Sequence, residues 1–266
     1  MNWPLVSALF VTYNRVHLLE RTLAAFTQNT DYPNLERVIA DDGSPAPVQE
    51  QIRQLKFDKY ELAARNGGLG ANMNTGLAAC GGKYVLVLQD DWDCQGPASW
   101  LRQAIAVMEQ NPQLGLVKYY GIEHHTIGAP LPGSDVDCRR ISPQPGSHES
   151  LHVYSDPPHI SSCSFLRFIG PYKEDVPMEQ CELDYAARVS NQDQYFAALF
   201  PAYYNKLFLH TGENDSFRTN TLRFRMERAL LPTANVLKRY GGPVFGISRG
   251  IYRGITQTLV RMRLMK

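Results

Sequence analysis

Three aspartates, Asp90, Asp91 and Asp93, stand close together in the sequence. Carboxylates at this spacing repel one another, so the group is unfavourable unless a positive charge compensates it. A divalent cation suits that purpose, because hard cations bind carboxylate oxygens. An alternative is that the aspartates cap a helix beginning near Pro97, since Asp is a favoured N-cap residue. The spacing predicts one of these two roles, a metal site or a helix cap.

The residues that precede the aspartates indicate how the group is positioned. Val85 to Leu88 form a continuous apolar run, typical of a strand that is buried on both faces of a parallel sheet. In open α/β sheets, ligands bind beyond the carboxyl ends of the strands. A second apolar run, Val38 to Ala40, leads into Asp41 and Asp42 in the same manner. We therefore expect both acidic groups at the ligand-binding edge of one sheet.

Strand-like and helix-like segments alternate over the first 120 residues. This alternation predicts right-handed crossovers and an α/β fold with a Rossmann-like, mostly parallel central sheet flanked by helices. Beyond Gly121, residues 124–160 show little periodicity and predict a long functional loop, with His124, His125, His148, His152 and His159 lining an acceptor loop. Strands are predicted at 5–11, 38–40, 60–64, 84–88 and 114–120, helices at 18–28, 48–55, 71–79, 98–110 and 176–189, and a strand pair within 196–209.

The charge is divided unevenly along the chain. Residues 221–266 contain ten Lys and Arg against one Glu, whereas the first 220 residues carry 17 basic and 25 acidic residues, a net charge of −8. Apolar residues at helical spacing, such as Ile251 and Ile255, make the basic segment an amphipathic helix. Such a helix either contacts an anionic membrane peripherally or packs on the domain or on a second copy. The acidic body offers no motif for binding nucleic acid.

The five cysteines are widely spaced and include no Cys-x-x-Cys pair. They therefore predict neither a disulfide framework nor a zinc site, and they favour a reducing compartment. The sequence contains no apolar run of the roughly 18 residues that a spanning helix needs, and no signal peptide is indicated. The expected location is the cytoplasm, at the inner face of the cytoplasmic membrane if the basic segment binds lipid.

The chain contains four motifs in this order: Val6-Ser7-Ala8-Leu9-Phe10-Val11-Thr12-Tyr13-Asn14, Ile39-Ala40-Asp41-Asp42-Gly43-Ser44, Asn66-Gly67-Gly68 with Asn74-Thr75-Gly76, and Asp90-Asp91. Together they resemble the inverting glycosyltransferases of family 2, which have the GT-A fold, with Asp90-Asp91 at the position of the family's Asp-x-Asp motif. The resemblance implies a GT-A domain over residues 1–220, with a nucleotide-sugar-binding half (1–120) and an acceptor-side half (121–220), followed by the basic extension 221–266.

The resemblance also implies roles for individual residues at the donor site. Asp42 would accept a hydrogen bond from the nucleobase; the alternative is an Asx-turn at Asp41 or Asp42. Asp91 would bind Mn²⁺ or Mg²⁺ directly, and His210 would complete the metal shell, where imidazole suits Mn²⁺ better. Asp93 is expected to cap the following helix. The residues expected to bind the nucleotide sugar are Val11, Thr12, Tyr13, Asp42, Asn66, Gly67, Asn74 and Asp90.

Inversion at the anomeric carbon needs a general base that takes the proton of the acceptor hydroxyl. The pattern Cys181-Glu182-Leu183-Asp184 is similar to the segment that supplies this base in the family, which puts Glu182 at the base position. Glu179, one helical turn earlier, is the second candidate, and Asp184 is the third. The alternative is that all three acids lie on a solvated helix surface.

Together these features predict a metal-dependent inverting glycosyltransferase. It would move a sugar from a nucleoside diphosphate sugar, UDP-linked, to a glycan or lipid-linked cell-envelope acceptor. One rival is a sugar-1-phosphate nucleotidyltransferase, which would carry a Gly-rich basic loop after the first strand, where this chain has Thr12-Tyr13-Asn14-Arg15-Val16. A second rival is a non-catalytic relative that binds a sugar nucleotide or a glycan.

Overall fold

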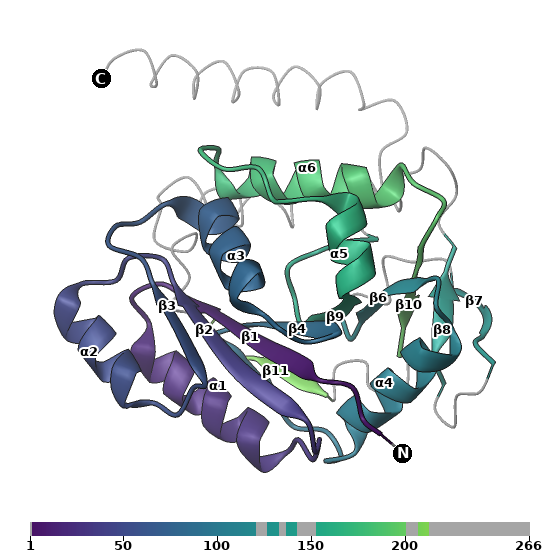
Figure 1. Ribbon diagram of the computed structural model, residues 1–266, viewed down its shortest axis with the longest axis horizontal. Helices are drawn as coiled ribbons and strands as arrows, with labels where there is room; N and C mark the ends of the chain where they lie inside the picture. The colour runs from purple at the N-terminus through teal and green to yellow at the C-terminus, as the bar shows by residue number, and fades with distance from the viewer. Residues whose placement is uncertain (1, 121–126, 133–136, 143–152, 201–206, 213–266) are drawn as a thin grey trace, which may run out of the picture. The chain divides into compact units, whose positions relative to one another are not determined.

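A nine-stranded mixed β-sheet lies at the centre of the computed structural model, which describes residues 2–120, 127–132, 137–142, 153–200 and 207–212 (Figure 1). Its strand order is β3-β2-β1-β4-β9-β6-β10-β8-β7. The first four of these strands are parallel to one another. They are β1 (Val6–Thr12), β2 (Leu35–Asp41), β3 (Lys59–Leu62) and β4 (Tyr84–Gln89), connected by the helices α1 (Val16–Gln28), α2 (Ala46–Gln54) and α3 (Gly68–Ala79).

The strands β1 and β4, and the Val38 to Ala40 part of β2, are apolar on both sides because helices cover both faces of the sheet. Along β1, Ala8 and Phe10 pack with α1 and α2, while Leu9 and Val11 pack with α3. The ring of Phe10 meets that of Phe26 edge to face at 5.4 Å. The continuous apolar runs that predicted a parallel sheet are therefore explained, and that prediction is confirmed.

The other half of the sheet is less regular. β9 (His159–Ser162) lies antiparallel between β4 and β6 (Leu114–Lys118), and β10 (Phe196–Leu199) continues the sheet parallel to β6. β8 (Arg139–Ile141) and β7 (Ile127–Pro130) complete the edge. The prediction of a long loop over 124–160 was thus wrong in part, because three short strands in that region carry no clear alternation.

His159 illustrates why β9 escaped prediction. Its side chain is 1% exposed in the middle of the sheet, where it pairs with Val87 of β4 on one side and Lys118 of β6 on the other. The expectation that His159 lines an acceptor loop was therefore wrong. The other four histidines of that group, at positions 124, 125, 148 and 152, lie outside the described residues.

A separate two-stranded sheet holds the end of the described chain. β5 (Trp92–Cys94) pairs antiparallel with β11 (Phe208–His210). The prediction of a strand pair within 196–209 was wrong in this respect: β10 and β11 are both strands, but each pairs with a different, distant partner. Local pattern identifies a strand, whereas its partner depends on burial in the whole fold.

The helices form one layer on each face of the sheet (Figure 1). α1, α2 and α4 (Trp100–Gln110) cover one face, and α3, α5 (Cys163–Ile169) and α6 (Met178–Ser190) cover the other. The side chain of Ser162 caps α5 by accepting a hydrogen bond from the backbone N–H of Phe165 at 3.2 Å. The helix predicted at 176–189 is confirmed as α6, while α5 was not predicted.

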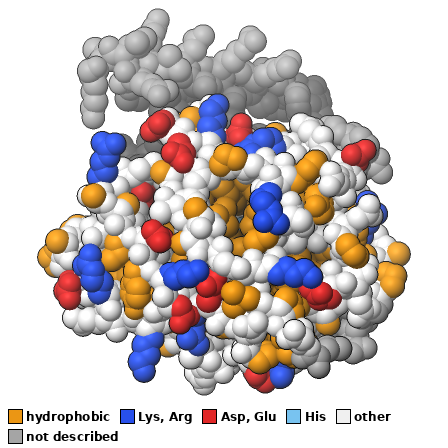
Figure 2. Space-filling model, in the orientation of Figure 1, with side chains coloured by type: hydrophobic (Ala, Val, Ile, Leu, Met, Phe, Trp, Pro, Cys, Tyr) orange, Lys and Arg blue, Asp and Glu red, His pale blue; other side chains and the backbone are white. Residues whose placement is uncertain are grey.

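By its internal contacts, the chain up to Gly212 forms one compact unit. Acidic and basic side chains are interspersed over the face that Figure 2 shows. Within the described ranges, no helix is both long enough and apolar enough to cross a membrane. The predicted basic helix and the predicted domain boundary at residue 220 lie outside the described residues, so both stay predictions.

Candidate active site

The carboxyl ends of three neighbouring strands meet at one edge of the sheet. Thr12 at the end of β1 pairs with Asp41 at the end of β2, and Val11 pairs with Gln89 at the end of β4. The next residue, Asp90, accepts a hydrogen bond from the Thr12 hydroxyl at 2.6 Å. Residues that are far apart in the sequence therefore converge where ligands bind in open α/β sheets.

Asp90 is fully buried and is compensated by Arg15, which precedes α1. The Arg15 guanidinium donates from Nε to Asp90 Oδ2 at 3.2 Å and from Nη2 to Asp90 Oδ1. Burial raises the pKa of Asp90 to about 6, although Arg15 and the Thr12 hydroxyl act in the opposite direction. Arg15 was not predicted as a site residue, and the only sequence signal was a lone basic residue just after the first strand.

Asp91 lies between two donors from distant parts of the chain. Its Oδ2 atom is 2.9 Å from Arg15 Nη1 and 3.4 Å from His210 Nε2. Burial pushes the pKa of Asp91 upward, but the hydrogen bond from His210 and the charge of Arg15 outweigh that effect, so the pKa is lowered. The other oxygen, Oδ1, is buried and has no hydrogen-bond partner among the described residues. Asp91 thus offers a charged oxygen that the described residues leave unsatisfied.

The two-stranded sheet brings His210 to Asp91. His210 pairs with Trp92 across β5 and β11, and their rings lie 4.8 Å apart. The backbone N–H of Thr211 then donates to the carbonyl oxygen of Asp91 at 2.8 Å. A Cβ atom at Gly212 would overlap Asp91 Oδ2 and lie 2.5 Å from Asp91 Cβ, so only glycine allows the chain to pass this close.

This arrangement fits a divalent cation that is shared with a ligand. Asp91 and His210 supply one carboxylate and one imidazole, a donor set suited to Mn²⁺ or Mg²⁺. No cluster of three or more metal-ligating side chains occurs in the part of the chain that the structure describes. Mg²⁺ is commonly bound by one or two carboxylates together with substrate phosphates, so a third protein ligand is not required.

The third aspartate of the group has a different role. Asp93 lies within β5 and forms an ion pair with Arg21 of α1, with 2.6 Å between Arg21 Nε and Asp93 Oδ2. The following helix, α4, begins after Ser99 and has no side-chain cap. The prediction that Asp93 caps this helix was therefore wrong, and the alternative reading of the whole group as helix caps is excluded.

Asp41 and Asp42, at the end of β2, have different hydrogen-bond partners. Asp41 accepts hydrogen bonds from the backbone N–H and the hydroxyl of Ser44, three residues further along the chain. An Asx-turn would bond the N–H two residues on, so Asp41 fixes the turn after β2 by a bond that reaches one residue further than that alternative predicts. Asp42 accepts from the backbone N–H groups of Gly67 (2.7 Å) and Gly68 (3.1 Å) at the start of α3. Burial raises the pKa of Asp42, partly offset by those two bonds. The contact of Asp42 with a nucleobase stays a prediction.

Asn74 connects α3 to the segment that leads into α6. Its Nδ2 donates to the carbonyl oxygen of Tyr172 at 2.9 Å, and its Oδ1 accepts from the Tyr172 N–H at 2.8 Å. A Cβ atom at Gly70 would overlap the Lys173 carbonyl oxygen and lie 3.3 Å from Cys181 Sγ. The start of α6 is therefore packed directly against the first turn of α3.

The three candidate bases lie on α6 in different surroundings. Glu182 is half-buried, and its Oε1 accepts from the backbone N–H of Asp156 at 3.3 Å. Glu179 is exposed in the first turn. Asp184 forms an ion pair with Arg188 at 3.0 Å. The carboxylate of Glu182 is therefore fixed by a backbone N–H.

Buried tyrosines support α6 beneath Glu182. The rings of Tyr172 and Tyr185 stack at 3.9 Å, and the hydroxyls of Tyr154 and Tyr172 are 2.6 Å apart. Burial raises the pKa of Tyr154 and Tyr172 well above the usual value, so both hydroxyls stay protonated. Tyr185 therefore joins α6 to a cluster of buried aromatic side chains from the segments before this helix.

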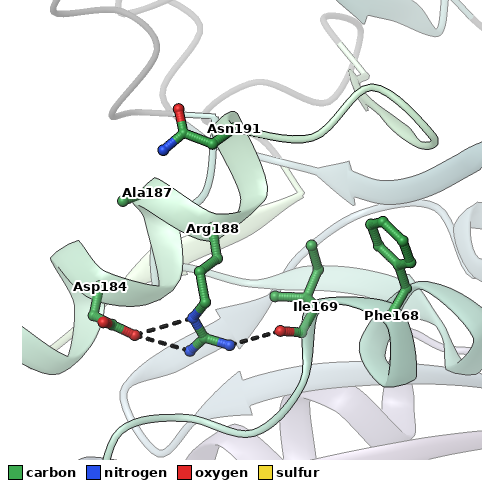
Figure 3. A pocket seen from close by; sticks show the side chains of 6 residues that line it. All are labelled: Phe168, Ile169, Asp184, Ala187, Arg188 and Asn191. Atoms are coloured by element: carbon green, nitrogen blue, oxygen red, sulfur yellow. Dashed lines mark hydrogen bonds and ion pairs between the residues drawn. The ribbon is translucent and has the colours of Figure 1, made fainter.

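A shallow groove of about 360 Å³ lies between α5 and α6, and Figure 3 shows its lining. Arg188 bridges the groove by donating to Asp184 and to the carbonyl oxygen of Ile169, at 2.7 Å for the latter. None of Asp90, Asp91 and His210 lines it. Asp184 thus lines a groove that is separate from the group formed by Asp90, Asp91 and His210.

The remaining predicted donor-binding residues differ in exposure. Val11 is buried between the strands, Tyr13 is half-buried after β1, and Asn66 is exposed beside Gly67. The structure thus brings Thr12, Asp90, Asp91 and His210 into one group. The roles of all these residues in ligand binding stay predictions.

Comparisons with known proteins were made for the sequence and for the structure. The model of the family described as "Glycosyl transferase family 2" matches residues 7–170. Over 123 residues the chain is 29% identical to the GalNAc(5)-diNAcBac-PP-undecaprenol beta-1,3-glucosyltransferase of Campylobacter jejuni, a match that covers 44% of this chain and 38% of that protein. The chain therefore spans less than half the length of this curated relative.

Two solved proteins share the fold at low sequence identity. Staphylococcus aureus TarS 1-349 matches with a TM-score of 0.57 and 18% identity over 79% of this chain and 61% of that one. Its complex with UDP-GlcNAc matches with a TM-score of 0.51 and 17% identity, over 74% and 56%. The mannosyltransferase PcManGT from Pyrobaculum calidifontis, in complex with GDP-Man and Mn²⁺, has a TM-score of 0.57 and 18% identity, over 91% and 67%.

The structural matches confirm the fold predicted from the four motifs, the GT-A fold with its mostly parallel central sheet. The family match covers more than half of the chain and includes β1, both aspartate pairs and β9. The chain belongs to glycosyl transferase family 2.

Proposed function

We propose that this chain is a metal-dependent inverting glycosyltransferase. Its donor would be a nucleoside diphosphate sugar in which the nucleotide is UDP. The observation that carries the proposal is the position of His210 beside Asp91, whose buried Oδ1 atom has no partner among the described residues. A side chain of this kind is unfavourable unless a ligand satisfies it. Membership of a glycosyltransferase family favours this reading over a nucleotidyltransferase.

Asp91 and His210 would hold Mn²⁺ or Mg²⁺, and Asp90 would contact the ribose or a water on the metal. When bound, the metal would neutralise the charge that develops on the departing nucleoside diphosphate. The protein's own contribution is to fix these side chains before the donor arrives. Thr12 and Arg15 orient Asp90, and the Thr211 backbone holds Asp91.

Glu182 would act as the general base that takes the proton of the acceptor hydroxyl. The Asp156 N–H bonds Glu182 Oε1, and Oε2, for which the described residues show no hydrogen bond, would take the proton. The two hydrogen bonds between Asn74 and the Tyr172 backbone, and the close packing at Gly70, keep α6 next to the start of α3, where Asp42 bonds the backbone. Glu182 would thereby stay at a fixed distance from the bound donor.

The similar proteins suggest the classes of donor and acceptor. Solved relatives of the fold are described as complexes with UDP-GlcNAc and with GDP-Man and Mn²⁺. The Campylobacter relative is named for an undecaprenol-diphosphate-linked acceptor. We therefore propose a glycan or lipid-linked acceptor and action at the inner face of the cytoplasmic membrane, with residues 221–266 contacting anionic lipid.

A thermal-shift screen of UDP, GDP, dTDP and CDP, each with Mn²⁺, Mg²⁺ or EDTA, tests the proposal. A ligand at a hundredfold excess over its Kd stabilises the native state by about 2.7 kcal/mol. We expect a metal-dependent shift with UDP. A shift with another diphosphate would change the donor class, and no shift with any nucleotide would contradict the proposal.

The membrane contact has its own test. Replacing Arg249, Arg253, Arg261 and Arg263 by Glu in the full chain reverses the charge of the predicted helix face. The variant should no longer sediment with vesicles containing anionic phosphatidylglycerol, whereas the unmodified chain should. Equal sedimentation of both would contradict membrane binding through this segment.

A further inference from the structure

The guanidinium of Arg15 lies between the two carboxylates that the proposed metal site needs. It uses three nitrogens: Nε and Nη2 contact Asp90, and Nη1 contacts Asp91 Oδ2 at 2.9 Å. The guanidinium and its carboxylate partner are largely shielded from water, since the Arg15 side chain is 19% exposed and that of Asp91 is 6% exposed. An ion pair in such surroundings is screened far less by salt than a surface pair.

Arg15 and a metal ion would compete for the same oxygen. Asp91 Oδ2 is the atom closest to both Arg15 Nη1 and His210 Nε2. A cation held jointly by Asp91 and His210 must therefore either displace Arg15 from Oδ2 or lie beside its positive charge. With Asp90 and Asp91 ionised, the site carries two negative charges, and one of them is already neutralised by Arg15.

A diphosphate removes this conflict. Its negative charges attract both the metal and the guanidinium, and Arg is well suited to phosphate because its planar fork donates two parallel hydrogen bonds. Once Arg15 moves from Asp91 to the diphosphate, both oxygens of Asp91 become available for the metal. The free energy lost when the ion pair between Arg15 and Asp91 breaks is then offset by the new contact between Arg15 and the diphosphate.

We propose that Arg15 is a counter-ion that competes with the metal for Asp91 until a nucleoside diphosphate arrives, so that the metal binds weakly unless the nucleotide is present. This inference rests on the proposed function of Asp91 and His210. Its consequence is positive coupling: each ligand binds weakly alone, and each strengthens the other by the same factor. The arrangement would keep the site free of metal ions that come without a donor.

The chain offers a matched control for this idea. Arg21 also pairs with an aspartate of the group, Asp93, at 2.6 Å, but its side chain is 55% exposed and Asp93 is not one of the proposed ligands. Replacing Arg21 removes one positive charge near the site without freeing Asp91. Any effect found for Arg15 and not for Arg21 therefore belongs to the contact with Asp91.

The test is Mn²⁺ binding to the full chain, followed by electron paramagnetic resonance of free Mn²⁺, with and without UDP and, in a second arm, GDP. For the unmodified chain we expect weak Mn²⁺ binding that tightens at least tenfold with nucleotide. Arg15→Gln should bind Mn²⁺ at least tenfold tighter than the unmodified chain without nucleotide, and should lose most of the nucleotide effect. Arg21→Gln should behave like the unmodified chain.

Arg15→Gln leaves Asp90 buried without its cation, so its melting temperature must be measured first. If the variant does not fold, the double variant Arg15→Gln with Asp90→Asn removes both charges and leaves Asp91 accessible. Mn²⁺ affinity in the folded variant that equals or falls below that of the unmodified chain overturns the inference. Tight Mn²⁺ binding to the unmodified chain without nucleotide also overturns it, whereas absence of Mn²⁺ binding with every nucleotide overturns the proposed function itself.

Discussion

His210 Nε2 lies 3.4 Å from Asp91 Oδ2, although the two residues belong to different segments, which the β5–β11 pairing and the hydrogen bond from Thr211 bring together. This contact holds the candidate metal ligands in place before any ligand binds. It also distinguishes Asp91 from Asp93, which lies two residues further along the chain, within β5, and pairs with Arg21 instead. The adjacent carboxylates can therefore be tested against each other.

Asp91→Asn should abolish metal-dependent nucleotide binding, whereas Asp93→Asn should retain it. The amide keeps the size of the side chain but removes the charge that a divalent cation needs, and we expect a loss of roughly 100-fold or more in metal affinity, beyond the 10–100-fold typical of outer-shell partners. Isothermal titration of UDP in the presence of Mn²⁺ measures this. Equal losses of metal affinity in both variants would indicate that the acidic group as a whole, and not Asp91 in particular, binds the metal.

Glu182→Gln should lower the transfer rate by about 10²- to 10⁴-fold, the range of a lost general base, and leave donor binding intact. The amide oxygen still accepts the N–H of Asp156, so the helix should not move. Glu179→Gln, in the exposed first turn, is the control and should retain activity. Single-turnover transfer from a radiolabelled donor measures both variants, and full activity of Glu182→Gln would contradict the assignment.

Asn74→Ala should destabilise the protein by roughly 1–3 kcal/mol, because it leaves the N–H and the carbonyl of Tyr172 without partners. Asn66→Ala, at an exposed position, should change stability by less than about 0.5 kcal/mol. Urea unfolding followed by circular dichroism gives both values. Equal stability of the two variants would show that the Asn74 hydrogen bonds do not hold α3 to the segment before α6.

The buried His159 makes stability depend on pH. Burial lowers the pKa of His159 to about 4, and the nearby charge of Lys118 acts in the same direction. The folded protein therefore favours the neutral ring, so this contribution is complete above pH 6.5 and is lost as the pH falls toward 4. The difference of about 2.5 pH units corresponds to roughly 3 kcal/mol.

The variant His159→Gln isolates that contribution. The stability difference between the unmodified chain and this variant should shrink by roughly 3 kcal/mol between pH 7 and pH 4, because only the unmodified chain takes up a proton at residue 159 on unfolding. Unfolding free energies from urea titrations at four pH values measure the trend. A difference that does not change with pH would contradict it.

The sequence predicted those elements whose burial is visible in a local pattern. β1, β2 and β4 are apolar on both faces because helices cover both sides, and α1 and α4 show a 3.6-residue period. β9 and β5 were missed for the opposite reason. Their polar residues, such as Ser161 and Asp93, are buried by partners from other parts of the chain, and no local rule identifies such partners.

The candidate site was predictable to the same extent. Motifs pointed to Asp91 and His210, and the structure brings these two together. The ion pair between Arg15 and Asp90 spans 75 positions and is invisible in local sequence. Asn74 shows another limit: the motif singled it out for the donor, while its amide bonds the Tyr172 backbone, 98 positions away.

The hydrogen bond between Thr211 and the Asp91 carbonyl joins residues 120 positions apart, and this has a consequence for the order of assembly. Contacts of such sequence separation form late, because a long loop must close first. The strands β1 to β4 can pair as soon as residue 89 has left the ribosome, whereas the candidate metal ligands Asp91 and His210 meet only after residue 210 has been synthesised. The growing chain therefore passes through a stage in which these four parallel strands are complete and Asp91 can pair with Arg15 but not yet with His210.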